Sequence, residues 1–340
     1  MKNSLMVLAI VTMVGAMIQV GWADNLPTKE KPLLLKLATH VLPTHFLMSK
    51  EILPEWAGQI EEETGGRVKI KIFDSQSMGK LPEEWDMLKS GMSDIGWIVF
   101  PFYRGVFPLS EIMSQPGLKP TEGQEIDYYN AMFEKYLKAE YSEVKAFFPT
   151  ILGDTYLNTI QPLKNLDDLK GRQIRCGSSQ KEWVQAIGGT PATMPPSELY
   201  TALERGIVDG VTFPMDAVKS YKLYEVAKYH TPMNLGMGMA VFAMNQKVWD
   251  KLPTDIQQVF TKLNPELQKK MIHACLDNAQ KAIAIAEKNG SVVSALSDQD
   301  AAKLDTLTFP LAEAWAKEKD AKGLPGTEVF HYSKKLLNKN

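Results

Sequence analysis

Apolar and polar residues follow one another in short blocks that predict alternating strands and helices in the first part of the chain. Val68, Ile70 and Ile72 alternate strictly with basic residues, which is the period of a half-buried strand. The elements expected here are strands at 33–39, 68–73 and 95–100, and helices at 46–63 and 83–90. Strand, helix, strand, helix, strand is the order of an α/β layer fold with parallel strand pairing.

The middle of the chain repeats this theme. The predicted strands are 144–152, 155–160, 171–176, 191–194, 210–213 and 240–245, and the predicted helices are 128–137, 181–187 and 197–205. Ser197 is expected to cap the last of these helices, and Gly206 to end it. A second α/β unit that begins without a flexible linker indicates two domains between which the chain crosses more than once.

A long helix is predicted from Pro253 to about Lys288, because apolar residues recur there at helical spacing over many turns. Pro265 lies inside this pattern, and we expect it to break or kink the helix. Further helices are expected from there to the C-terminus.

The N-terminus has the pattern of a cleaved secretory signal. Lys2 precedes a nearly uninterrupted apolar run over 5–16, and Gly21 and Ala23 are small residues at the positions that a signal peptidase reads. We expect cleavage after Ala23 and a periplasmic mature protein. The alternative is an uncleaved membrane anchor, which the short apolar run disfavours.

Charge and cysteine content narrow the class further. A net charge of −2 argues against a nucleic-acid partner, since such partners select basic surfaces. Cys176 and Cys275 are the two cysteines, and they do not make a disulfide framework in a chain of 340 residues. Although an exported protein could pair them, we expect two small, buried, unpaired side chains.

Most catalytic constellations are missing from the sequence. It contains no Gly-x-Ser-x-Gly elbow, no phosphate-binding Gly-Lys-Ser loop and no Cys-x-x-Cys pair. His40 and His45 lie on either side of Pro43, which interrupts the helical face that a zinc-binding pair needs. We therefore expect no catalytic residue, no metal and no cofactor.

Polar and aromatic residues gather instead at the ends of the predicted strands, where ligands bind in open α/β sheets. The candidates of this kind are His40, Phe100, Phe102, Tyr103, Arg175, Trp183, Phe213 and Asp216. We expect them to converge on one cleft between two lobes. Spacing alone leaves core packing open for each aromatic residue, and a surface ion pair open for Arg175.

Residues 166–229 resemble the substrate-binding subunits of TRAP transporters, the tripartite ATP-independent periplasmic family. They contain "LDDLKGRQIRCGSS", "IGGTPATMPPSELYTALERGIVDGVTFP" and "YKLYEVAKYH", which match three family patterns in order. The N-terminal half agrees in "EEETGGRVKIKIF", "MGKLPEEWDMLKSGMSDIGW" and "FPLSEIMSQPGL". The resemblance covers nearly all of the mature chain.

This resemblance implies a two-lobed periplasmic-binding-protein fold, α/β in class, with a ligand cleft between the lobes and a long helix spanning both. The expected lobes are 24–152 with about 241–275, and 153–240 with about 276–340. The implied function is capture of a small organic acid and its delivery to the TRAP membrane permease by a protein that we expect to be a monomer. The family's carboxylate-binding arginine falls on Arg175, whose planar guanidinium matches a carboxylate with two parallel hydrogen bonds.

Three positions depart from the family pattern. Phe213 replaces an asparagine, Thr155 falls near a second arginine, and Val99 falls near an acidic residue of other branches. Each change removes a polar ligand contact, so we expect a less hydroxylated ligand with an apolar or aromatic body. The residues expected to form an apolar wall around it are Trp97, Phe100, Tyr103, Trp183 and Phe213.

Three other functions remain open at this stage. A binding protein of an ATP-driven importer shares the two-lobed plan, and a sensor subunit could present the same ligand to a receptor. A periplasmic enzyme acting on organic acids is the third alternative, although no nucleophile or carboxylate pair is placed by a motif.

Overall fold

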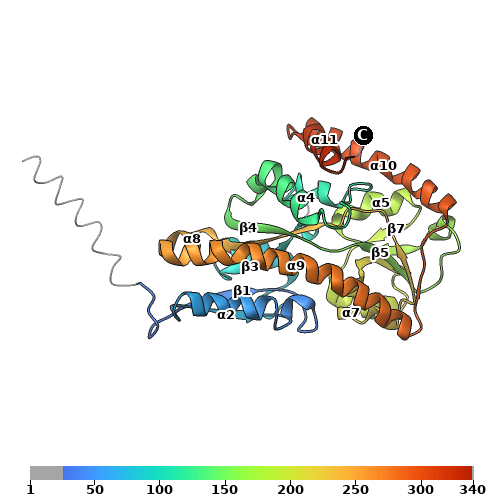
Figure 1. Cartoon of the computed structure of the whole chain (residues 1–340). Coiled ribbons are helices and arrows are strands. Elements are labelled where there is room, and N and C mark those ends of the chain that lie inside the picture. Colours follow the sequence, from blue (N-terminus) through green and yellow to red (C-terminus); the bar gives the residue numbers. More distant parts are fainter. Residues whose placement is uncertain (1–25, 104, 339–340) are drawn as a thin grey trace, which may run out of the picture.

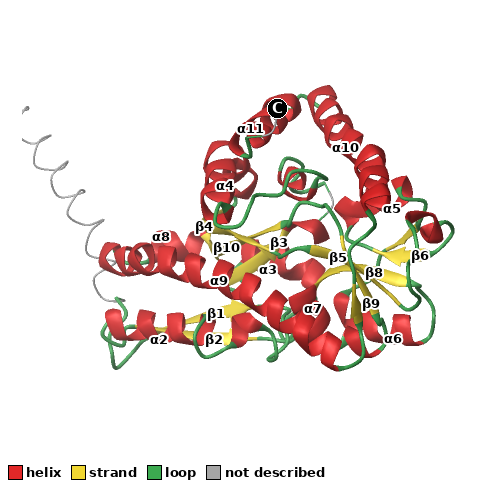
Figure 2. Cartoon of the chain, turned by 45° about the vertical axis from the view of Figure 1, so that its right-hand side comes forward, coloured by secondary structure: helices red, strands yellow, loops and turns green. Residues whose placement is uncertain are grey.

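The computed structural model describes residues 26–103 and 105–338, so the predicted signal peptide and its cleavage site lie outside the described residues. Two mixed β-sheets with helices packed against them form the fold (Figures 1 and 2). In the described part of the chain, no helix is long and apolar enough to cross a membrane.

The first sheet has five strands in the order β2-β1-β3-β10-β4. Its strands are β1 (Leu33–Ala38), β2 (Val68–Phe73), β3 (Ile95–Val99), β4 (Val144–Ile151) and β10 (Met239–Asn245). The pairs β1–β2 and β1–β3 are parallel, as the sequence predicts, whereas β10 runs antiparallel to both β3 and β4. Strand β10 is buried along its whole length, because it lies in the interior of the sheet.

The second sheet has six strands in the order β11-β9-β5-β8-β6-β7. Its strands are β5 (Thr155–Thr159), β6 (Gln173–Arg175), β7 (Thr190–Ala192), β8 (Gly210–Pro214), β9 (Tyr229–Pro232) and β11 (Val292–Val293). Strand β5 is antiparallel to β8 and β9, and β6 is parallel to β7 and β8. Strands β6 and β8 therefore end at the same edge of this sheet.

Helices α2 (Leu53–Glu63), α3 (Glu84–Ser90), α4 (Glu125–Met132) and α8 (Gln246–Lys251) pack around the first sheet, and α5 (Lys181–Ala186), α6 (Leu199–Glu204) and α7 (Met215–Ser220) pack around the second. The helix predicted at 46–63 is split: a 3₁₀ turn covers Phe46–Met48, and α2 begins only at Leu53. Pro54 explains this start, because proline lacks an N–H group and fits the first turn of a helix.

The long helix α9 (Thr254–Lys288) runs along both lobes, as expected (Figure 1). Phe260 and Met271 belong to the core of the first sheet, whereas Ala282 and Ala286 belong to a core of the second. Pro265 does not break the helix, which is continuous through it; the predicted break is therefore wrong. Packing on both cores outweighs the loss of one backbone hydrogen bond.

Helices α10 (Asp298–Ala321) and α11 (Gly326–Leu336) close the chain and arch over the molecule (Figure 2). Leu304 of α10 packs in the core around α5, while Trp315 and Phe330 pack in the core of the first sheet. The C-terminal helices therefore contact both lobes, and the lobe boundaries given above stay a prediction.

Two local predictions differ from the structure. Ser197 lies inside a 3₁₀ turn (Pro196–Glu198) instead of capping α6, because the preceding Pro195-Pro196 pair sets a tighter turn first. Strand β9 is not evident from the sequence, since its His230 and Thr231 are polar and its burial depends on pairing with β5. Cys176 and Cys275 are buried and unpaired, as expected.

Candidate functional site

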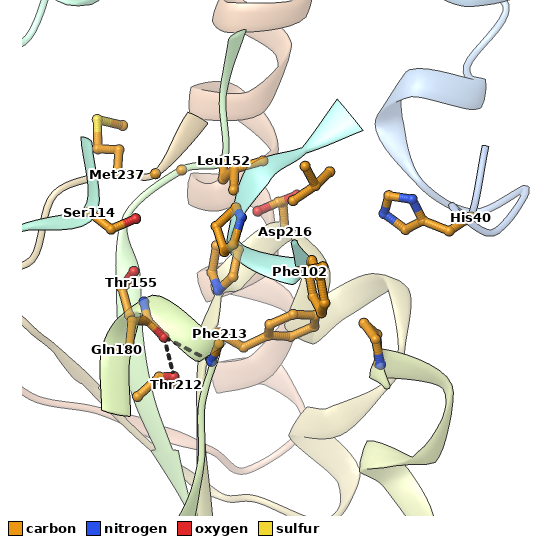
Figure 3. Close-up of a pocket in the computed structure, with 18 of the residues that line it drawn as sticks. His40, Phe102, Ser114, Leu152, Thr155, Gln180, Thr212, Phe213, Asp216 and Met237 are labelled. Atoms are coloured by element: carbon orange, nitrogen blue, oxygen red, sulfur yellow. Dashed lines mark hydrogen bonds between the residues drawn. The ribbon is translucent and has the colours of Figure 1, made fainter. Parts of the chain in front are cut away.

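A pocket opens between the two sheets and encloses about 820 Å³ of space free of protein atoms, part of it open to solvent. Both lobes contribute to its lining, which consists of His40, Val41, His45, Trp97, Val99, Pro101, Phe102, Ser114, Leu152, Gly153, Thr155, Arg175, Gly177, Gln180, Pro196, Thr212, Phe213, Pro214, Asp216, Ala217, Tyr221, Met237 and Gly238. Figure 3 shows the side chains pointing into this space from several strand ends.

Arg175 is the last residue of β6 and is 2% exposed. Its Nε and Nη2 atoms both donate to the carbonyl oxygen of Met194, at 3.1 and 2.9 Å, which fixes the plane of the guanidinium. The carbon of the guanidinium lies 5.8 Å from the ring of Phe102 and 5.4 Å from the ring of Phe213. Burial lowers the pKa of Arg175 to about 10, so the side chain stays positively charged at neutral pH.

Within the described residues, no carboxylate forms an ion pair with Arg175, and its Nη1 atom has no protein acceptor. A buried charge is costly unless an opposite charge or a set of hydrogen bonds compensates it. The guanidinium thus lines the pocket with unused donor capacity, which is the chemistry of an anion-binding group.

Gln180 and Thr212 stand beside Arg175 and give this side of the pocket a second donor. The Oε1 atom of Gln180 accepts from the Thr212 hydroxyl at 2.7 Å and from the Gly177 backbone N–H at 3.3 Å. Because both neighbours donate to Oε1, the amide nitrogen of Gln180 is left with its two N–H groups for another partner. Figure 3 shows Gln180, Thr212 and Thr155 together on one side of the pocket.

An apolar wall separates this donor group from the rest of the pocket. Trp97, Phe102 and Phe213 contribute rings, and Val99 and Leu152 contribute aliphatic surface. Trp97 is itself held by a hydrogen bond from its Nε1 to the Thr150 hydroxyl at 2.8 Å. A flat apolar body can pack against these rings, of which Trp97 is held by its hydrogen bond.

Two histidines and the carboxylate of Asp216 also line the pocket, and the carboxylate of Glu84 contacts His40. His40 Nδ1 lies 3.1 Å from a carboxylate oxygen of Glu84, and the His40 ring stacks on Trp97 with the ring centres 5.7 Å apart. Burial raises the pKa of Glu84, while the nearby His40 opposes that rise. His45 Nε2 lies 3.5 Å from Oδ2 of Asp216, which is a contact between the two lobes.

The structure brings seven of the predicted site residues into this pocket. They are His40, Trp97, Phe102, Thr155, Arg175, Phe213 and Asp216. Val99, the third position at which the family pattern changes, lines it as well. The expected convergence of strand ends on one cleft is met by these residues, although their contact with a ligand stays a prediction.

Three predicted site residues lie elsewhere. Phe100 is buried in the core of the first sheet. Tyr103 is buried too, and its hydroxyl donates to the carbonyl oxygen of Leu81 at 2.7 Å. Trp183 packs in a core of the second lobe beside α5 and lines a different, more polar hollow next to α10. At all three positions, core packing provides the reason for the aromatic side chain.

Several pocket residues are not singled out by the sequence. His45 draws notice there only as part of a metal pair, and Gln180 and Thr212 are ordinary polar residues. The rule that ligands bind beyond strand ends covers Gln180, which follows β6, but not Thr212, which lies inside β8. Tyr221 and Met237 come from a helix end and a connecting segment that carry no sequence signal. In the described part of the chain, no group of three or more metal-binding side chains comes together.

Comparison with known proteins gives a consistent result. The family model described as bacterial extracellular solute-binding protein, family 7, also called DctP, matches residues 38–319. The C4-dicarboxylate-binding periplasmic protein DctP of Rhodobacter capsulatus is 26% identical over 309 residues, which are 86% of each chain.

Solved structures agree in fold. A TRAP solute-binding protein from Rhodoferax ferrireducens, in complex with copurified benzoate, superposes with a TM-score of 0.81 at 21% identity, covering 90% of this chain and 98% of the other. A marine metagenome TRAP solute-binding protein, specific for aromatic acid ligands and in complex with 3-hydroxybenzoate, gives 0.83 at 22% identity with the same coverage. The two-lobed fold with a spanning helix is thereby confirmed.

Proposed function

This chain belongs to family 7 of the bacterial extracellular solute-binding proteins, and on that premise we propose that it captures a small organic acid with an apolar or aromatic body. It delivers this acid to a membrane permease of the TRAP type. After cleavage of residues 1–23, the mature protein acts outside the cytoplasm. It acts as a monomer, and it binds its ligand without converting it.

The observation that carries this proposal is the buried guanidinium of Arg175 without a carboxylate partner among the described residues. An organic acid supplies the missing charge, with two parallel hydrogen bonds to the fork and a further one from Gln180. In a pocket closed to water these bonds are stronger than at an exposed surface.

The remaining wall supports an apolar body for the ligand. Val99, Phe213 and Thr155 offer no charged or amide group to a ligand hydroxyl, and Phe102 and Phe213 flank Arg175 at ring-contact distance. Structural neighbours of this chain hold benzoate, 3-hydroxybenzoate and mandelate, whereas others hold L-gulonate or succinate. The aromatic wall favours the first group for this chain.

Capture proceeds by closure of the two lobes on the ligand. The acid contacts Arg175 on one lobe and the Trp97 and Phe102 rings of the other, so it binds the closed form better than the open one. This difference in affinity shifts the population toward the closed form, which the permease receives. An ATP-driven importer and a sensor are the alternatives for the partner.

Titration calorimetry on protein that has been unfolded and refolded to remove copurified ligand tests the proposal. We expect benzoate or a related aryl acid to bind at least about 10-fold more tightly than gulonate, since an apolar wall leaves sugar hydroxyls unpaired. Benzamide, which has the same ring without the negative charge, is the matched control and should bind far more weakly. Tighter binding of gulonate than of any aryl acid would contradict the proposal.

A further inference from the structure

A buried cation and a buried carboxylate line the same pocket without pairing with each other. Arg175 is 2% exposed and Asp216 is 4% exposed, and no ion pair joins them in the described part of the chain. Arg175 ends β6, whereas Asp216 stands in the first turn of α7, which follows β8. A molecule bound between them can accept hydrogen bonds from Arg175 and donate one to Asp216.

Asp216 has one oxygen in use and one without a partner. Its Oδ2 atom faces His45 Nε2 at 3.5 Å, and His45 Nδ1 accepts from the Leu47 backbone N–H at 3.3 Å. The hydrogen of a neutral His45 ring therefore sits on Nε2 and points to Asp216. The Oδ1 atom of Asp216 is buried and has no hydrogen-bond partner among the described residues.

The place of Asp216 in the first turn of α7 does not provide a hydrogen-bond donor for Oδ1. A carboxylate in the first turn of a helix is favourable, because the N–H groups there are unpaired. Yet Asp216 Oδ1 accepts from none of them. It lies instead near Gly153, which lines the pocket: a Cβ atom added to Gly153 would stand 3.5 Å from Asp216 Oδ1 and 3.2 Å from Cys275 Sγ. A buried acceptor left unpaired in this way costs free energy that a bound donor recovers.

His40 provides a second acceptor beyond the aromatic wall. Its Nδ1 faces the buried Glu84 carboxylate at 3.1 Å, so Nδ1 carries the hydrogen and Nε2 of the neutral ring is an acceptor. Figure 3 shows His40 on the side of the pocket away from Thr155, Gln180 and Thr212, with Asp216 and the Phe102 ring between them. The pocket thus has donors at one end and acceptors toward the other.

We propose that Asp216 is a specificity-determining residue, and that the preferred ligand carries a hydroxyl group remote from its carboxylate that donates to Asp216 Oδ1. This rests on the proposed function and refines it from organic acids in general to hydroxylated aryl acids. Arg175 and Gln180 bind the carboxylate of the ligand, and the rings of Trp97, Phe102 and Phe213 enclose its body. Asp216 accepts a hydrogen bond from its hydroxyl group.

A hydroxyl group matches the acceptors better than an ammonium group does. Asp216 Oδ1 is a single free acceptor, with His45 already facing the other oxygen. An ammonium brings three N–H donors and a full charge into a wall made largely of rings, and leaves donors unpaired there. A hydroxyl brings one donor and no charge.

Calorimetric titration with a matched series of acids tests this assignment. The probes are benzoate, its three monohydroxy isomers, the corresponding methoxy acids, which cannot donate, and the corresponding aminomethyl acids, which carry the ammonium. For the wild-type protein we expect one hydroxy isomer to bind at least about 10-fold more tightly than benzoate, and its methyl ether and ammonium analogue to lose that gain.

The Asp216→Ala variant supplies the decisive comparison, with Asp216→Asn as the shape-conserving variant if the first does not fold. We expect the affinity ratio of the hydroxy acid to benzoate to fall to within about threefold of one in Asp216→Ala, and to an intermediate value in Asp216→Asn, because hydrogen bonds to a charged acceptor are the stronger ones. Asp154→Asn is the control: Asp154 pairs with Lys119 and does not line the pocket, so the ratio should stay as in the wild type.

The outcomes separate this inference from the proposed function. The role of Asp216 is overturned if the wild-type protein binds no hydroxy acid more tightly than benzoate, or if this higher affinity persists in the folded Asp216 variants. It is also overturned if the ammonium acid binds more tightly than the hydroxy acid. In each case organic-acid binding stays in place. Failure of every acid to bind, benzoate included, overturns the proposed function itself.

Discussion

Arg175 donates hydrogen bonds to a single carbonyl group and has no other hydrogen-bond or ion-pair partner among the described residues. In this it differs from an arginine with a purely structural role. A structural arginine inside a protein has a carboxylate partner, since the desolvation cost of its charge is otherwise not met. Here the two bonds to Met194 orient the fork, and the remaining donors face the pocket.

Replacement of Arg175 by methionine should abolish binding and spare the fold. Methionine is unbranched and fills most of the space of the arginine stem without a buried charge, while the Met194 carbonyl loses two donors. These effects oppose each other, so we expect the free energy of unfolding to change by less than about 2 kcal/mol. Affinity for an aryl acid should fall at least about 100-fold, as two charge-assisted hydrogen bonds are lost.

Calorimetry and urea unfolding measure the two quantities. Arg175→Lys is the matched control, because it keeps the charge but not the planar fork, and it should bind with an intermediate affinity. Near wild-type affinity in Arg175→Met would remove Arg175 from the site.

Phe213 should set the preference between an aryl acid and a sugar acid. Replacement by asparagine removes a ring from the pocket wall and adds an amide, so we expect aryl-acid affinity to fall by about 10-fold and gulonate affinity to rise. Phe213→Leu keeps an apolar side chain and should lose less aryl-acid affinity without a gain for gulonate. Equal behaviour of the two variants would show that the polar group has no effect.

The sequence predicts those residues of the candidate site that lie at or just after the end of a recognisable strand. Arg175, Phe213 and Asp216 follow β6 and β8 closely, and the structure brings them together. Phe100 and Tyr103 follow β3 equally closely, but their side chains turn into the core. The direction of an aromatic side chain in a turn depends on the packing around it, which the sequence does not encode locally.

At the scale of elements, the segment between β9 and β10 brings Met237 and Gly238 to the pocket by packing tightly on the 3₁₀ turn of Ser110–Ser114. Gly236 donates to the Gln115 carbonyl at 3.1 Å, and Gly238 donates to the Met113 carbonyl at 3.0 Å. A Cβ atom on Gly236 would meet the carbonyl oxygen of Met113 at 2.3 Å. The backbones approach each other too closely for any other residue.

Replacement of Gly236 by alanine should therefore destabilise the protein by at least about 2 kcal/mol, because backbone atoms have to move apart. The matched control is Gly58→Ala in the interior of α2, where an added Cβ meets nothing within 4 Å. That change should stabilise by about 0.5–1 kcal/mol through helix propensity. Urea unfolding measures both, and a Gly236→Ala variant as stable as the wild type would contradict the described packing.

Elements with strong periodicity can be predicted nearly to their ends, and those that depend on distant contacts cannot. Strand β2 matches its alternating pattern from Val68 to Phe73, and α9 follows its apolar stripe from Thr254 to Lys288. Strand β9 contains a buried histidine that bonds to Asn158 on β5, and the segment is a strand because its backbone pairs with β5 and β11, which are distant in sequence.

At the scale of the whole molecule, the pocket lies between two sheets, and α9 packs on the cores of both. The buried histidine of β9 makes the second sheet sensitive to acid. His230 is fully buried, its Nδ1 lies 2.8 Å from Asn158 Oδ1, and burial lowers its pKa to about 4.

Stability should therefore fall as pH is lowered through this range. The unfolded chain binds a proton at the ordinary histidine pKa of about 6.5, whereas the folded chain takes it up only near 4, so protons favour unfolding between these values. The contribution is full above about pH 6.5, and we expect about 2–3 kcal/mol to be lost on acidification to pH 4.5. Urea unfolding across this range should show a flatter profile for His230→Asn than for the wild type.

The exposed His331 of α11 is the control for this pH dependence. His331→Asn should follow the wild-type profile, because the ring is exposed to solvent and folding does not bury it. If His230→Asn also follows the wild-type profile, the loss of stability in acid has another source.

A crystal structure of the protein with a bound aryl acid tests the central claim most directly. We expect the acid between the two sheets, with its carboxylate oxygens about 3 Å from the guanidinium nitrogens of Arg175 and its ring against Phe102 and Phe213. An acid bound elsewhere, or one whose carboxylate points away from Arg175, would contradict the account.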